Sequence, residues 1–225
     1  MAANNAYCMD CMEYMKTLPD KAFDLAVVDP PYGLGIDGQK ERIDYKNPKH
    51  SRKYHEQKMW DTRPQKEYFD ELFRVSKNQI IWGGNYFIEY LDEPHKGWII
   101  WDKMQYGLTM SDGEIAYTSF DLPTRIFSMN RVVLLKENTI HPTQKPVALY
   151  AWIYKNYAKP GMKILDTHLG SGSSRIAAWD AGLDFVGTEI DETYFNLQEE
   201  RFKKHISQPR IEQYIQQEAE QERLF

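Results

Sequence analysis

The stretch Asp29-Pro30-Pro31-Tyr32 holds the residue types best suited to chemistry on a ligand. It follows residues 23–28, an apolar run that predicts a buried strand. The prolines end the strand, so a carboxylate, free carbonyls and an aromatic ring stand at its carboxyl end, where ligands bind in open α/β sheets. A planar base with an exocyclic amine fits, because Asp29 and the Pro30 carbonyl would accept its amine hydrogens while Tyr32 stacks on its ring. The alternative is a strand-ending turn with one surface acid.

A second motif combines a predicted strand, a glycine-rich turn and the start of a helix. Gly170 and Gly172 let the backbone approach a ligand, and the helix N-terminus offers free amides. Glu189 ends the next predicted strand, where an acid would bind ribose hydroxyls. The third glycine of a dinucleotide-binding fingerprint is replaced by Arg175. Asp166, ahead of the glycines, suits a cationic amino-acid head better than a pyrophosphate.

Strands alternate with helices along the chain, which predicts one α/β domain. The sequence pattern predicts strands at residues 5–8, 23–28, 79–82, 98–101, 114–120, 125–129, 162–166 and 185–189. It predicts helices at residues 10–18, 64–75, 146–157, 173–181 and 192–205, and a polar helical tail at 208–223.

Composition is that of a globular protein with no unusual class signature. The chain has 225 residues and a net charge of −5, so nucleic-acid binding has to rest on local charge. The start has no signal-peptide pattern and no apolar run is long enough for a bilayer, so we expect a cytoplasmic protein with no membrane partner. The two cysteines, Cys8 and Cys11, form a C-x-x-C without a second ligand pair at zinc spacing. We therefore expect reduced thiols and no metal, with a redox pair as the alternative.

Residues 33–66 form a long segment with no clear apolar period. The segment holds nine Lys or Arg against five acids, with aromatic residues between them. This mixture in an acidic chain favours a DNA-contacting arm that follows phosphates, and the alternative is a solvated surface loop. The candidate DNA-binding residues are Lys40, Arg42, Lys46, Lys49, Arg52 and Lys53.

The order of the motifs resembles a known enzyme family. The chain is similar to class beta S-adenosylmethionine-dependent DNA amino-methyltransferases, in which a catalytic Asp-Pro-Pro-Tyr precedes the glycine-rich cofactor motif. The resemblance extends to about residue 205. Its further blocks are residues 10–13 (Asp-Cys-Met-Glu), 83–85 (Gly-Gly-Asn), 101–103 (Trp-Asp-Lys), 112–114 (Asp-Gly-Glu) and 141–146 (His-Pro-Thr-Gln-Lys-Pro).

The resemblance implies a Rossmann-like α/β methyltransferase fold. We expect a mostly parallel seven-stranded sheet with helices on both faces and a circularly permuted motif order. The methyltransferase domain would span residues 1–206, and residues 207–225 would be the helical tail.

The resemblance also assigns a cofactor, S-adenosylmethionine, and its ligands. Asp10 would contact the adenine of the cofactor, and Thr143 and Lys145 its methionine end. Thr167-His168 stand where the family usually has Pro-Phe, so His168 either lines the cofactor pocket or is a structural histidine. The implied cofactor-binding residues are Asp10, Cys11, Thr143, Lys145, Asp166, His168, Gly170, Gly172, Ser173 and Glu189.

The implied reaction is methyl transfer to N6 of an adenine flipped out of double-stranded DNA. Asp29, Pro30, Pro31 and Tyr32 would be catalytic. Alternatives within the class are a cytosine-N4 or an RNA adenine methyltransferase. Outside it, a nicotinamide-dependent oxidoreductase would explain the glycine turn, and a non-catalytic DNA-binding protein would explain the basic segment. A homodimer and a partner restriction nuclease are left open.

Overall fold

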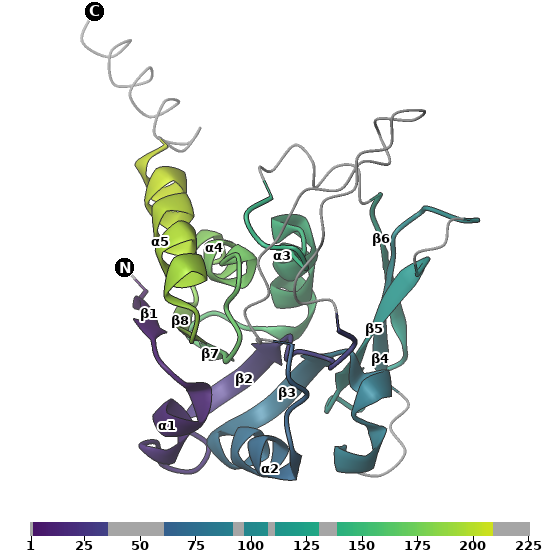
Figure 1. Ribbon diagram of the computed structural model, residues 1–225, viewed down its shortest axis with the longest axis horizontal. Helices are drawn as coiled ribbons and strands as arrows, with labels where there is room; N and C mark the ends of the chain where they lie inside the picture. The colour runs from purple at the N-terminus through teal and green to yellow at the C-terminus, as the bar shows by residue number, and fades with distance from the viewer. Residues whose placement is uncertain (1, 36–60, 92–96, 108–110, 131–138, 209–225) are drawn as a thin grey trace, which may run out of the picture.

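A computed structural model describes residues 2–35, 61–91, 97–107, 111–130 and 139–208. In these residues one sheet has the strand order β1-β8-β7-β2-β3-β5-β4-β6 (Figure 1). The strands are β1 (Asn4–Cys8), β2 (Phe23–Val28), β3 (Ser76–Trp82), β4 (Trp98–Asp102), β5 (Gly113–Thr118), β6 (Arg125–Ser128), β7 (Lys163–Asp166) and β8 (Asp184–Glu189). The helices are α1 (Cys11–Lys16), α2 (Lys66–Val75), α3 (Val147–Tyr157), α4 (Ser173–Asp180) and α5 (Glu192–Ser207), with two short 3-10 turns, η2 (Gly84–Tyr86) and η3 (Ile88–Tyr90).

The sheet is parallel from β1 to β3 and mixed beyond β3. The pairs β1–β8, β8–β7, β7–β2 and β2–β3 are parallel, whereas β5 runs antiparallel to both β3 and β4. The expected count of seven strands is wrong for the described sheet, which has eight. The eighth arises because β6 pairs in parallel with the outer side of β4 and extends the sheet by one edge strand.

Alternate residues of β2 enter the cores on the two faces of the sheet. Leu25 and Val27 pack with α3 and α4, whereas Ala26 and Val28 pack with α1 and α2. All four side chains are buried, as the continuous apolar run predicts for a strand covered on both faces. Figure 1 shows α1 and α2 on one side of the sheet and α3, α4 and α5 on the other, so the expectation of helices on both faces is confirmed.

Two predicted segments lie largely outside the described residues. These are most of the basic segment, including all six candidate DNA-binding residues, and the C-terminal tail beyond Gln208.

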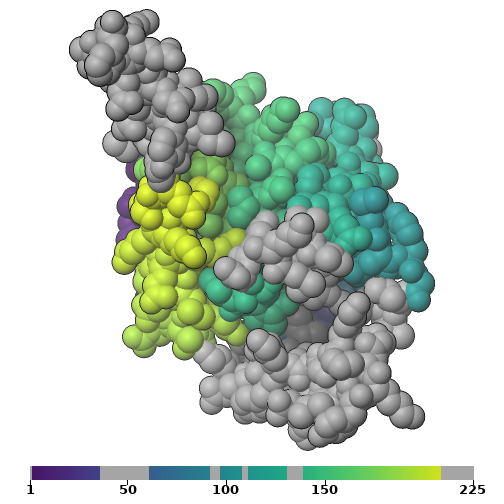
Figure 2. All heavy atoms as spheres, turned by 90° about the horizontal axis from the view of Figure 1, so that it is seen from above, coloured from purple at the N-terminus to yellow at the C-terminus, as the bar shows by residue number. Residues whose placement is uncertain are grey.

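In the described parts of the chain, no helix combines the length and apolarity needed to cross a membrane. Seen from above in Figure 2, α5 in yellow and strands β4–β6 in teal lie at opposite sides of the molecule.

Candidate active site

The Asp-Pro-Pro-Tyr tetrapeptide at residues 29–32 lies at the centre of the sheet. Asp29 follows β2 directly, between the parallel neighbours β3 and β7. The carboxyl ends of parallel strands share one edge, so Asp29 comes close to the turn that follows β7. The tetrapeptide and the glycine loop line the same cleft, which has a volume of about 480 Å³.

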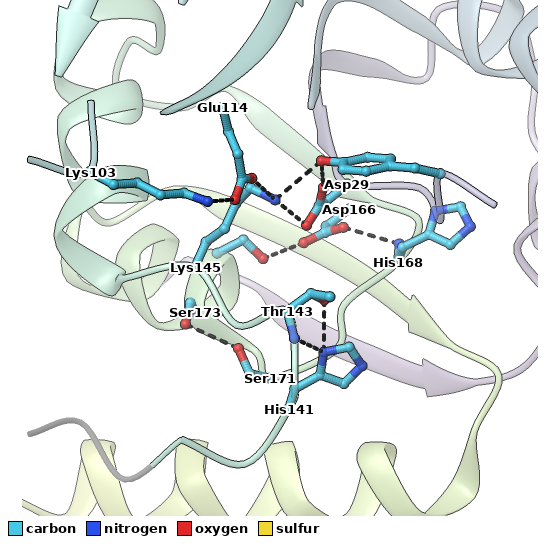
Figure 3. A network of polar contacts seen from close by, with 12 residues as sticks. Asp29, Lys103, Glu114, His141, Thr143, Lys145, Asp166, His168, Ser171 and Ser173 are labelled. Carbon is cyan, nitrogen blue, oxygen red and sulfur yellow. Dashed lines mark hydrogen bonds and ion pairs between the residues drawn. The ribbon is translucent and has the colours of Figure 1, made fainter. Parts of the chain in front are cut away.

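Both carboxylate oxygens of Asp29 have a partner in the chain (Figure 3). The Tyr32 hydroxyl donates to Oδ1 at 2.7 Å, and the Lys145 ammonium forms an ion pair with Oδ2. Burial raises the pKa of Asp29, while Lys145 and the Tyr32 hydrogen bond oppose the rise. Asp29 is thus a desolvated carboxylate whose ionised form depends on these two neighbours.

Lys145 continues this contact into a chain of four charges. Its Nζ lies 3.0 Å from Oε2 of Glu114, and Glu114 Oε1 lies 2.6 Å from Nζ of Lys103. The Lys145 side chain is only 3% exposed, so its ammonium depends on these carboxylates for charge compensation. Burial alone would raise the pKa of Glu114, but Lys145 and Lys103 outweigh it and lower that pKa to about 2. Burial likewise opposes the charge on Lys145, but Asp29 and Glu114 raise its pKa overall.

The Tyr32 ring packs closely against Gly83 and Tyr86. Gly83 follows β3 with φ of +68°, and a Cβ placed there would lie 2.2 Å from Cε1 of Tyr32. Only glycine combines this backbone conformation with such a close approach. Tyr86 stacks on Tyr32 with centroids 4.9 Å apart and planes inclined by 22°. Tyr86 also lines the cleft and is 39% exposed, so the two rings form an aromatic surface at its wall.

The glycine loop connects β7 to α4 and is held by internal hydrogen bonds. Gly170 and Gly172 both have positive φ, +50° and +73°, which glycine adopts without strain. The Gly170 amide donates to Oε2 of Glu189 at 2.8 Å, and the Asp191 amide donates to Oε1 at 2.9 Å. Glu189 is therefore fixed at the end of β8 with its carboxylate on the cleft wall, and burial raises its pKa.

Asp166 lies beneath this loop rather than on the cleft wall. The residue is 2% exposed and accepts hydrogen bonds from the Ser174 hydroxyl and, at 3.1 Å, from the His168 amide. Burial raises the pKa of its carboxyl to about 7. In this structure Asp166 joins the loop to the first turn of α4.

The sequence allows two roles for His168, and its geometry has elements of both. It lines the cleft, while its Nδ1 lies 2.9 Å from the Thr167 hydroxyl and its ring packs edge-on against Tyr68 at 5.3 Å. Burial lowers the pKa of the imidazole to about 4, so the ring is neutral at physiological pH.

Asp10 and Cys11 start α1 beside β1. Asp10 is the N-cap of this helix, and its Oδ1 accepts from the amides of Met12 at 2.7 Å and Glu13 at 3.1 Å. Burial, helped by Asp10, raises the pKa of the Cys11 thiol to about 12. Cys8 and Cys11 are free thiols, and the described residues hold no His, Cys or acidic cluster suited to a metal.

The cleft brings together most of the predicted site. Its wall includes nine of those residues: Asp29, Pro30, Pro31, Tyr32, Thr143, Lys145, His168, Gly170 and Glu189. It does not include five: Asp10, Cys11, Asp166, Gly172 and Ser173. The assignment of cofactor roles to these residues stays a prediction.

Several other residues of the cleft have no role that the sequence predicts. Lys103 and Glu114 lie in blocks that carried the family resemblance, but only the sheet pairing of β4 with β5 shows that they meet. His141 packs edge-on against Tyr194 at 4.3 Å, and its Nδ1 lies 3.0 Å from the Thr143 hydroxyl. For Tyr86, the one feature of the sequence that points to the site is its position directly after the Gly-Gly-Asn block.

Comparison with known proteins identifies the family. The sequence-family model of the N6/N4 DNA methylases matches residues 45–200, more than half of the chain. The chain belongs to this family. Membership confirms the prediction of an S-adenosylmethionine-dependent DNA methyltransferase. The family includes both adenine-N6 and cytosine-N4 enzymes, so the match does not distinguish these two, and it does not identify the class beta subtype.

Individual relatives are distant in sequence but cover most of the chain. Type II methyltransferase M.HpaI of Haemophilus parainfluenzae is 24% identical over 89% of this chain and 74% of its own length. The crystal structure of the M1.HpyAVI–SAM complex has a TM-score of 0.58 at 18% identity, covering 88% of this chain and 98% of that one. PvuII DNA methyltransferase, which is cytosine-N4-specific, has the same TM-score at 14% identity, covering 90% and 87%. These structures confirm the methyltransferase fold.

Proposed function

We propose that this methylase transfers the methyl group of S-adenosylmethionine to N6 of an adenine flipped out of double-stranded DNA. The observation that carries the proposal is Asp29, a desolvated carboxylate at the carboxyl end of a central strand, in the same cleft as the glycine loop. An aspartate at this position resembles adenine-N6 enzymes, because cytosine-N4 enzymes more often carry serine there. The fold itself does not decide, since a cytosine-N4 enzyme is equally similar in TM-score.

The residues around the glycine loop fit the proposed cofactor. The amides of Gly170 and Gly172 are already bonded within the chain, to Glu189 and to the Leu169 carbonyl, which disfavours a pyrophosphate at this turn. Glu189 lines the cleft, and each of its oxygens has a second lone pair that can accept from a ribose hydroxyl. Gln144, also on the wall, has a buried Nε2 with no hydrogen-bond partner among the described residues. The carboxylate at the methionine end of the cofactor could accept a hydrogen bond from it.

The protein has to promote attack by a poor nucleophile, adenine N6, on the methyl group of the cofactor. The lone pair of adenine N6 is delocalised into its ring, and the cofactor supplies an electrophilic methyl group on a sulfonium. Asp29 and the Pro30 carbonyl accept the two amine hydrogens, which favours a tetrahedral nitrogen and stabilises the positive charge that grows on it. After transfer the nitrogen loses one proton, and Asp29 is placed to accept it and pass it to solvent.

Binding of the target base rests on the aromatic surface. A base inside a duplex cannot reach the cleft, so it has to be flipped out. Tyr32 and Tyr86 offer ring faces for it, and stacking on an aromatic side chain contributes roughly 1–3 kcal/mol per base. We propose that the basic segment at 33–66 supplies phosphate contacts, which position the duplex without reading its sequence.

The identity of the methylated base tests the proposal. Duplex DNA of mixed sequence is incubated with the protein and S-adenosylmethionine carrying a labelled methyl group, then digested to nucleosides. We expect the label in N6-methyladenine. Label in N4-methylcytosine would replace the adenine assignment, and transfer to RNA alone would remove DNA as the substrate.

A further inference from the structure

Both carboxylate oxygens of Asp29 already have a partner in this structure. One of its oxygens accepts from Tyr32 at 2.7 Å, and the other is ion-paired with Lys145 (Figure 3). The proposed reaction needs one of these oxygens for a hydrogen of the target amine. Each oxygen keeps a second lone pair, so the amine would share an oxygen with one of these partners. The charged Lys145 ammonium competes most strongly with the amine for the electron density of the carboxylate, and a weaker contact with Lys145 would favour amine binding.

A buried ammonium needs another partner when it leaves a carboxylate. Lys145 is 3% exposed, and a buried charge that loses its partner is strongly destabilising. Glu114 Oε2 lies 3.0 Å from the same Nζ, on the side away from Asp29 in Figure 3. Lys103 holds the other oxygen of Glu114 at 2.6 Å, and this fixes the carboxylate in place.

We propose that Glu114, held by Lys103, is a positioning residue that takes over the Lys145 ammonium when the target amine binds Asp29. The inference rests on the proposed function, because it concerns how the same carboxylate becomes available. Lys145 thereby acts between two carboxylates at the catalytic end of the cleft, in place of the role at the methionine end that the family resemblance gives it.

The charged and titratable groups around Asp29 come from five parts of the fold. Lys145 stands just before α3 and Tyr150 lies on it, Glu114 lies on β5, Asp166 ends β7, Tyr68 lies on α2, and Tyr32 lies in the tetrapeptide itself. Of these, only Lys145 is a cation, so its division between Asp29 and Glu114 controls the ionisation of Asp29. Lys103 acts one step further away, through Glu114.

Substitutions of Glu114 and of Lys103 should therefore shift the pKa of Asp29 in opposite directions. In Glu114→Gln, Lys145 has only Asp29, so the pKa of Asp29 falls and the ammonium no longer has a carboxylate to move to. We expect kcat at its pH plateau to fall by roughly ten- to a hundredfold, because Lys145 then stays fully paired with Asp29 and competes with the target amine. In Lys103→Met, Glu114 loses its other cation and pairs more strongly with Lys145, so the pKa of Asp29 rises. As the pH falls, methyl transfer should therefore be lost at a higher pH than in the wild type.

Two measurements test the inference. The first is ¹³C NMR titration of the aspartate carboxyls in the protein without cofactor or DNA, with the Asp29 signal identified by its loss in Asp29→Asn. The second is kcat for methyl transfer as a function of pH. Glu71→Gln is the matched control, because Glu71 pairs with Arg74 on α2 at a similar side-chain exposure, 23% against 25% for Glu114, away from the cleft.

Opposite shifts of the Asp29 pKa in the two variants, with none in Glu71→Gln, are the expected result. Shifts in the same direction, or no shift, would overturn the inference and leave the four charges a structural cluster. If Glu114→Gln does not fold, a fall or no change in the Asp29 pKa of Lys103→Met overturns the inference by itself, and a rise supports it. The NMR result does not require turnover, so a protein that fails to methylate DNA would refute the proposed function separately.

Discussion

The Tyr32 side chain has two separable functions in this site. Its ring lies against Gly83 and Tyr86, and its hydroxyl donates to Asp29 at 2.7 Å. The sequence predicts only the role of the ring, because a stacking surface can be recognised from residue type. The hydroxyl contact depends on how the two prolines turn the chain, and residue types alone do not specify that turn.

Tyr32→Phe should separate the two functions. The hydrogen bond from the hydroxyl lowers the pKa of Asp29, so its removal raises that pKa further. In the proposed mechanism the ionised carboxylate is the active form, so activity should be lost at a higher pH than in the wild type as the pH falls. Single-turnover rates across pH measure this, with Tyr32→Ala in parallel, which should lose a further factor of about ten or more with the ring. Identical pH profiles for wild type and Tyr32→Phe would show that the hydroxyl has no effect on Asp29.

At the scale of elements, the turns after the strands determine where the site forms. Gly83, in the turn after β3, provides the surface on which Tyr32 packs, and its positive φ and missing Cβ are both required. The same edge of the sheet carries the tetrapeptide after β2 and the glycine loop after β7. A change in one of these turns should therefore affect a side chain that belongs to another.

Gly83→Ala should displace Tyr32 and reduce methyl transfer. We expect a loss of about 1–3 kcal/mol in the free energy of unfolding from overpacking, in addition to backbone strain. Denaturant unfolding and single-turnover transfer measure the two effects. Gly182→Ala is the control, because Gly182 has nearly the same φ, +67°, but open space around its Cβ position. Equal losses in both variants would mean that strain alone, and not the contact with Tyr32, accounts for the effect.

The predicted elements agree with the observed ones where local signals were strong. All eight strand segments and all five helices within the described residues were predicted, since apolar runs and caps such as Asp10 are local features. The start of β3 was predicted three residues late, because Ser76, Lys77 and Asn78 are poor strand formers. Ser76 is nevertheless buried and pairs with Phe23, so the neighbouring strand determines its conformation.

At the scale of the whole molecule, the site depends on sheet order. Asp29, the pair Lys103 and Glu114, and Lys145 come from three separate parts of the sequence. Glu114 lies near Asp29 because β5 inserts between β3 and β4, and Lys145 reaches both from the segment before α3. No local pattern predicts that insertion, so motif reasoning found the two ends of the cleft but not the ion pairs beside Asp29. The result is one cleft that the tetrapeptide and the glycine loop both line, and we propose that chemistry occurs at the first and cofactor binding at the second.

The central claim is that Asp29 acts in the chemical step and not in cofactor binding. The most direct measurement is single-turnover methyl transfer to duplex DNA by Asp29→Ala, with S-adenosylmethionine affinity determined by calorimetry on the same preparation. We predict a loss of transfer of roughly a hundred- to a thousandfold, as for removal of one preorganised transition-state contact, with cofactor affinity nearly unchanged. Near-normal transfer by Asp29→Ala would contradict the account, because the tetrapeptide would then be only the turn that ends β2.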